Sequence, residues 1–95
     1  MDSKNRRDLL ADAASRAANY LEELNERRVG PMPGSVKCLT DALDSPLPEA
    51  PSEPTDIIAF LDEYGSPSTI ASAGGRYFGF VTGGALPSTL AANYL

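Results

Sequence analysis

The chain has 95 residues, so it forms at most one small domain. It carries 13 acidic and 8 basic residues, a net charge of −5, and its basic residues are scattered except for Arg6-Arg7 and Arg27-Arg28. Because nucleic-acid and polybasic membrane-binding sites need clustered lysine and arginine, the composition speaks against both kinds of partner.

Residues 6–28 are predicted to form an amphipathic helix, because apolar residues recur at three- and four-residue intervals and charged residues fill the other side. The apolar positions are Leu10, Ala13, Ala14, Ala17, Leu21 and Leu24. Gly30 and Pro31 would end the helix, and Arg27-Arg28 would complement its dipole. A stripe so rich in alanine buries little area. It therefore favours docking on another surface over nucleation of a core.

Residues 29–54 form a connector whose prolines are Pro31, Pro33, Pro46, Pro48, Pro51 and Pro54. Proline stops helices and favours extended or turn geometry. Within the connector, residues 35–43 are predicted to form one or two helical turns with Ser35 as the N-cap. A connector of this length is unusual inside a compact small domain. It indicates an arm that lies over another surface.

Residues 55–64 are predicted to form a second amphipathic helix, which begins at Pro54 or Thr55. Its acidic residues are Asp56, Asp62 and Glu63. We interpret them as the solvated side of a short helix and not as a pair of catalytic carboxylates.

The most unusual stretch is Gly74-Gly75-Arg76-Tyr77-Phe78-Gly79-Phe80-Val81-Thr82-Gly83-Gly84-Ala85-Leu86-Pro87, which sets three aromatic residues between two pairs of glycines. Residues 76–82 are rich in aromatic and β-branched side chains, so they are predicted to be extended. Pro87 opens a last predicted helix, residues 87–95. Residues 77–95 carry no charge, but their glycines and polar residues make them too weakly hydrophobic for a membrane span.

Several kinds of chemistry are excluded by what the sequence lacks. It has no histidine and a single cysteine, Cys38, so it offers no histidine base, no histidine metal ligand and no internal disulfide. A reducing compartment is expected. The glycine-rich stretch lacks the Gly-Lys-Ser/Thr ending of a P-loop and the spacing of a dinucleotide-binding turn. Cys38 has no partner base, so we interpret it as a small apolar filler.

The aromatic run has two interpretations. Tyr77, Phe78 and Phe80 either pack as core residues on alternating faces of a strand, or they line the wall of a small-molecule pocket. In the second case the glycines keep the neighbouring backbone out of the way. Thr82 would then supply a hydroxyl that donates a hydrogen bond to a carboxylate.

The order of an alanine-rich helix, a proline-containing arm, a second amphipathic helix and then Gly-Arg-Tyr-Phe-Gly-Phe-Val-Thr-Gly-Gly-Ala-Leu-Pro resembles the N-terminal part of group II pyridoxal-phosphate-dependent decarboxylases. This family includes aromatic amino-acid and glutamate decarboxylases. The resemblance covers residues 9–95, it is most specific in residues 75–87, and the turn at residues 29–31 adds to it. Many members carry His-Pro where this chain has Gly74-Gly75, and many have another residue in place of Val81. In these features the chain resembles a bacterial-type branch.

The resemblance implies a cytoplasmic homodimer that uses pyridoxal 5′-phosphate to remove the carboxylate of an amino acid, with this segment as an arm on the partner subunit. The residues implied to bind substrate are Tyr77, Phe78, Phe80 and Thr82. The family's cofactor lysine, and the histidine and aspartate that bind the cofactor ring, would lie beyond residue 95. Lys4 and Lys37 do not match that lysine. No catalytic or cofactor-binding residue is therefore expected in residues 1–95, and this segment alone is expected to be inactive.

The expected fold is mainly α: an N-terminal amphipathic helix (1–28), a proline-rich arm (29–54), and an incomplete domain (55–95) with a helix, one short extended segment and the start of a further helix. By the resemblance, this is the start of an α/β enzyme of fold type I, the aspartate aminotransferase-like fold. The alternative, from another class, is a stand-alone helical module that binds other proteins through its alanine stripe and performs no catalysis.

Overall fold

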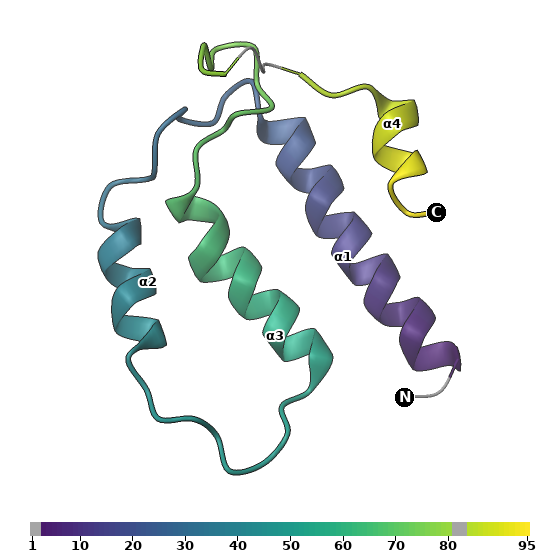
Figure 1. The fold of residues 1–95 in the computed structure, drawn as a ribbon, viewed down its shortest axis with the longest axis vertical. Helices are drawn as coiled ribbons and strands as arrows, with labels where there is room; N and C mark the ends of the chain where they lie inside the picture. The colour runs from purple at the N-terminus through teal and green to yellow at the C-terminus, as the bar shows by residue number, and fades with distance from the viewer. Residues whose placement is uncertain (1–2, 81–83) are drawn as a thin grey trace.

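The computed structural model describes residues 3–80 and 84–95, and the described chain is mainly helical, as the sequence predicts (Figure 1). Helices make up 57% of these residues. They are α1 (Ser3–Glu23), α2 (Ser35–Leu43), α3 (Pro54–Phe60) and α4 (Pro87–Ala92). α3 continues directly into a π-helical turn, η1 (Leu61–Gly65), and a 3₁₀ turn, η2 (Ser66–Ser68).

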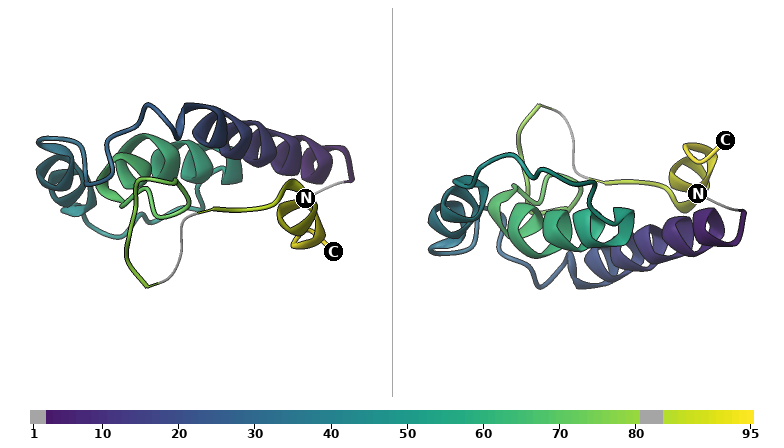
Figure 2. Two further views of the ribbon diagram at one scale, coloured as in Figure 1. Left: turned by 90° about the horizontal axis from the view of Figure 1, so that it is seen from above. Right: turned by 90° about the horizontal axis from the view of Figure 1, so that it is seen from below.

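α2, α3 and α1 lie side by side in a single layer (Figures 1 and 2). At one end of this layer, residues 44–53 of the proline-rich arm connect α2 to α3 in a U shape. The loop that follows η2 and the helix α4 lie on one side of the layer, as both views in Figure 2 show. Domains normally bury their apolar faces between two packed layers. Here one loop and one short helix are all that the described chain offers as a second layer.

The chain buries little of its own surface. Its accessible area is 7539 Å², whereas a compact protein of this size exposes about 5,200 Å². Its radius of gyration is 15.5 Å, against about 12–13 Å for a compact chain of this length. Among the described residues, the buried apolar side chains are those of Leu24 and Ala71. The fold therefore leaves most of its apolar side chains at least partly uncovered.

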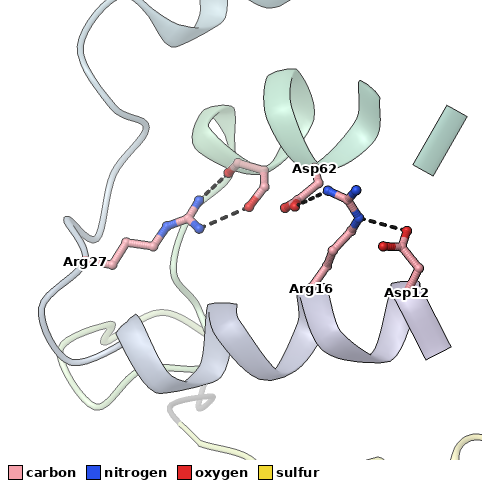
Figure 3. Close-up of polar contacts among 5 residues, drawn as sticks. Asp12, Arg16, Arg27 and Asp62 are labelled. Atoms are coloured by element: carbon pink, nitrogen blue, oxygen red, sulfur yellow. Dashed lines mark hydrogen bonds and ion pairs between the residues drawn. The ribbon is translucent and has the colours of Figure 1, made fainter. Parts of the chain in front are cut away.

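A shared arginine ties α1 to the end of α3. The Arg16 guanidinium donates to Asp12 Oδ2 at 3.0 Å and to Asp62 Oδ2 at 2.8 Å (Figure 3). The hydrogen bonds to Asp12 and then to Asp62 raise the pKa of Arg16 above its usual value. Because a raised pKa gives a contribution that is lost only as the pH rises through that pKa, this tie is constant across neutral pH. The three side chains are about one-third exposed or more, so solvent weakens the tie.

α1 ends earlier than predicted. The apolar pattern predicts a helix up to residue 28, but α1 ends at Glu23 and residues 24–26 form a turn. The main-chain N–H of Arg27 still donates to the carbonyl oxygen of Glu23 at 2.9 Å. The turn carries Leu24 out of the helical stripe and against Gly74, a contact between residues far apart in the sequence.

The N-cap prediction for α2 was wrong. Gly34, in the left-handed conformation with φ 77°, precedes the helix, and Ser35 is its first residue. The Ser35 hydroxyl donates to the carbonyl oxygens of Met32 (2.6 Å) and Pro67 (3.1 Å) and so ties the arm to η2. The start of α3 at Pro54 is confirmed, but the helical run does not end at residue 64 and continues through η2 to Ser68.

The predicted extended segment at 76–82 is not a strand in its described part. Residues 75 and 76 lie in a turn, residue 79 in a bend and residue 80 in a turn. Phe80 has φ 53°, which a strand does not allow. α4 ends at Ala92, three residues before the predicted end of the last helix.

We expect Leu24→Ala to lower the free energy of unfolding by about 2–3 kcal/mol, because it truncates the largest buried side chain among the described residues and leaves a cavity. Leu47→Ala is the matched control: it removes the same atoms from a side chain that is 91% exposed. We expect it to change stability by less than about 0.5 kcal/mol. Urea unfolding followed by far-ultraviolet circular dichroism measures both. Equal losses for the two variants would contradict the assignment of Leu24 to a buried junction.

Candidate functional site

The aromatic run is attached to the end of α1 by a small buried junction of Leu24, Ala71 and Gly74. A Cβ placed on Gly74 would lie 3.3 Å from Leu24 Cγ and 3.4 Å from the carbonyl oxygen of Ala71. A side chain at position 74 would therefore push these neighbours apart. This is one of the close backbone approaches that glycine permits. The junction fixes where the aromatic run leaves the layer.

Main-chain hydrogen bonds hold the loop after η2 along the segment that follows α1. The Ala71 N–H donates to the Val29 carbonyl oxygen at 2.8 Å, and the Met32 N–H donates to the Pro67 carbonyl oxygen at 2.8 Å. These bonds join residues 35 to 42 positions apart in the chain. No local sequence pattern could have predicted them.

Arg27 is a polar clamp beside the junction. Its guanidinium donates to the Ser66 hydroxyl at 3.0 Å and to the Ser66 carbonyl oxygen (Figure 3). The guanidinium carbon lies 4.8 Å from the centre of the Tyr20 ring, a cation–π distance. The sequence analysis interpreted Arg27 as a charge that complements the dipole of the first helix, and it did not predict these contacts. A planar guanidinium suits such a joint because it bonds along its edge and stacks on its face.

Arg76, which directly precedes the aromatic residues, binds the main chain of Arg27. Its guanidinium donates to the main-chain carbonyl oxygen of Arg27. The Tyr77 N–H donates to the Gly74 carbonyl oxygen at 3.2 Å. The start of the run is therefore held by a side-chain bond and a main-chain bond, although Arg76 itself is exposed.

Three of the four predicted pocket residues lie in the described part of the chain, and two of them are almost fully exposed. The side chains of Phe78 and Phe80 are each 93% exposed. Tyr77 is half-buried, and its ring folds back so closely on Gly79 that a Cβ there would overlap the Tyr77 hydroxyl. Thr82 lies outside the described residues. The described part of the run is therefore not a buried strand, and the pocket interpretation stays a prediction.

An open hollow of about 350 Å³ lies at the base of the aromatic loop. Its lining includes Gly75 from one side of the run and Gly84 from the other, together with Leu24 and Leu90. The two flanking glycines therefore border the same hollow. Among the described residues that line the hollow, Asn25 supplies the polar side chain, and none of them is an acid, a base or a nucleophile.

The residues of this chain do not fit pyridoxal phosphate. A lysine that binds the pyridoxal aldehyde must lose its proton, which requires a desolvated site. Lys37 is 81% exposed and its ammonium group lies 2.8 Å from Asp41 Oδ2, while Lys4 is exposed on α1. Within residues 3–80 and 84–95, no three side chains of the metal-ligating types His, Cys, Asp and Glu gather at one point.

Comparison with known proteins adds no relative: no family model, curated protein or solved structure matches the chain. In the described part of the chain, no helix has both the length and the apolar character needed to cross a membrane.

We expect Arg27→Gln to lower the free energy of unfolding by about 1–2 kcal/mol, because it removes charge-assisted hydrogen bonds and the contact with the Tyr20 ring. Arg28→Gln is the matched control, since Arg28 is the exposed neighbour and loses the same charge. We expect its effect to stay below about 0.5 kcal/mol. Thermal unfolding of the two variants compares them, and a larger effect at position 28 would show that the clamp is unimportant.

Proposed function

We propose that this chain is the N-terminal segment of a group II pyridoxal-phosphate-dependent amino-acid decarboxylase. In this proposal it contributes an arm to the contact between two subunits and aromatic residues to the substrate pocket, and it works in the cytoplasm, where the exposed Cys38 stays reduced. Residues 1–95 have binding and assembly roles. The removal of the substrate carboxylate belongs to groups outside this segment.

The observation that carries the assembly part of the proposal is the uncovered surface. The chain exposes 7539 Å², about 2,300 Å² more than a compact protein of its size. A permanent assembly buries roughly 2,000–5,000 Å² shared between its partners. The excess is therefore comparable to what one subunit buries in such an assembly. An arm that lies over another subunit accounts for an open layer of this kind.

The charges along α1 support a second copy of this chain as the partner. The first two turns carry three basic residues, Lys4, Arg6 and Arg7, against one acid, Asp8, and the last turn carries Glu22 and Glu23. Two α1 helices placed antiparallel would set the basic end of each against the acidic end of the other. Complementary charges of this kind orient partners and speed their encounter.

The apolar face of α1 has the spacing that such a pair requires. Leu10, Ala14, Ala17 and Leu21 follow each other at intervals of four, three and four residues, as in a helix–helix seam. Leu10 is 61% and Leu21 is 37% exposed, so the seam is uncovered. The small alanines at its centre permit a close approach of the two helices. The same face borders α4 across an open apolar hollow of about 440 Å³.

The aromatic residues support the substrate-pocket part of the proposal. Phe78 and Phe80 are both 93% exposed on a loop whose base is fixed at Gly74. Exposed rings of this size usually mark a binding surface. Amino-acid pockets use aromatic walls with a few polar groups, and Tyr77 and Thr82 would supply hydroxyls.

The second candidate function is a helical module that binds other proteins without catalysis. It is favoured by the exposed seam of α1, which needs a partner but no enzyme. Cooperative unfolding of the 95-residue chain as a monomer would support this module. Aggregation or disorder of the same chain in isolation would support the decarboxylase segment.

The first test is the native gene product itself. We expect an intact mass greater than that of residues 1–95, the visible absorbance of a pyridoxal–lysine adduct, and release of carbon dioxide from an amino acid. In that product we expect Phe80→Ala to raise KM about tenfold, because it removes one ring of the pocket wall, while the melting temperature stays close to that of the unmodified protein. A product of 95 residues without this absorbance would contradict the enzymatic proposal.

The second test concerns the antiparallel pairing of α1. We expect Glu22→Lys with Glu23→Lys, and separately Arg6→Glu with Arg7→Glu, to weaken self-association at least about tenfold, because each change sets like charges face to face. A 1:1 mixture of the two variants should recover association, which sedimentation velocity measures. Glu49→Lys with Glu53→Lys is the matched control on the arm and should leave association unchanged. Failure of the mixture to recover would contradict this pairing.

A further inference from the structure

The aromatic loop holds one bulky residue in an unfavourable backbone conformation. Phe80 has φ 53°, and it is the one non-glycine residue with positive φ among residues 3–80 and 84–95. Residues with a Cβ disfavour this left-handed region, because the Cβ approaches the following carbonyl oxygen. The Phe80 ring is 93% exposed, so little packing of the ring compensates for the strain.

Two hydrogen bonds hold the start of the turn that contains Phe80. The bond from Arg76 to the Arg27 carbonyl oxygen and the bond from the Tyr77 N–H to the Gly74 carbonyl oxygen fix its start. The Tyr77 ring then folds over Gly79, where a side chain would overlap it. These contacts do not involve the rings of Phe78 and Phe80. The strained residue therefore lies outside the contacts that fix the start of the turn.

The residue types of this loop favour a different conformation from the one observed. Tyrosine and phenylalanine prefer strands, and the sequence predicts an extended segment here. In an extended chain, side chains two positions apart point to the same face. Phe78 and Phe80 would then lie together on one face, with Tyr77 on the other. The observed turn, by contrast, leaves both phenylalanine rings uncovered.

We infer that residues 76–80 form a two-state element. One state is the turn with Phe80 at positive φ, and the other is an extended form that places Phe78 and Phe80 on one face. The role of the extended form as the assembled wall of the substrate pocket rests on the proposed function. The exchange between the two forms does not, because it follows from the strain at Phe80. A ligand that contacts both rings binds the extended form and shifts the population toward it.

Substitutions at position 80 test the exchange in the free chain. Glycine tolerates positive φ without strain, so Phe80→Gly should lower the population of the extended form about tenfold. Valine is branched at Cβ and tolerates positive φ least, so Phe80→Val should raise that population several-fold. Phe78→Gly and Phe78→Val are the matched controls, because residue 78 does not have positive φ. They should change the population less than about twofold. Relaxation dispersion of the amide nitrogens of residues 76–80 measures these populations, with circular dichroism as the check that each variant keeps its helices.

Three results would overturn the inference: no exchange at residues 76–80 in the unmodified chain, equal populations in Phe80→Gly and Phe80→Val, or shifts as large in the residue-78 controls. A further variant at position 80 keeps the ring and changes only the backbone conformation that the residue prefers. Replacement of Phe80 by its mirror-image amino acid, introduced by chemical synthesis, should stabilise the turn as glycine does. A lack of decarboxylase activity or of self-association would count against the proposed function alone, because none of these measurements uses a substrate or a partner.

Discussion

The described fold depends on the close approach of Gly74 to Leu24. Because this contact lies where α1 has just ended, it turns the chain after residue 70 back across the layer of helices. Ala71 is buried at the same place, and its N–H reaches the Val29 carbonyl oxygen at 2.8 Å. The position of the aromatic run follows from these few atoms. The small core consists of an apolar side chain from the turn after α1, a residue without a side chain and one main-chain hydrogen bond.

So small a buried region supports the proposal that the rest of the layer packs on another surface. Ordering the backbone costs roughly 1–2 kcal/mol per residue, and apolar burial must offset that cost. The ties that supplement the junction are partly exposed: Arg16 with Asp12 and Asp62, and Lys37 with Asp41. Exposed pairs of this kind contribute about 0–1 kcal/mol each. The physical argument for a partner thus comes from the fold itself and is independent of which function the whole protein performs.

The sequence predicts the helices well and their connections poorly, for a physical reason. Periodic apolar residues and prolines act over a few positions, so the existence of α1, α2 and α3, and the start of α3 at Pro54, could be predicted from local patterns. The end of α1, the role of Ser35 and the clamp by Arg27 depend on contacts with Gly74, Pro67 and Ser66. Those partners lie 32 to 50 positions away, and no local pattern specifies them.

The one conflict over secondary-structure type falls on the aromatic run. Local preference favours an extended chain there, while the structure folds it into a turn with Phe80 at φ 53°. Natural sequences are locally consistent with their folds, and exceptions gather at functional or strained positions. Gly75 and Gly84 line the same hollow at the base of the loop. In the exchange that we propose for residues 76–80, Gly75 absorbs the change of backbone angle, and the junction at Leu24 and Gly74 stays in place.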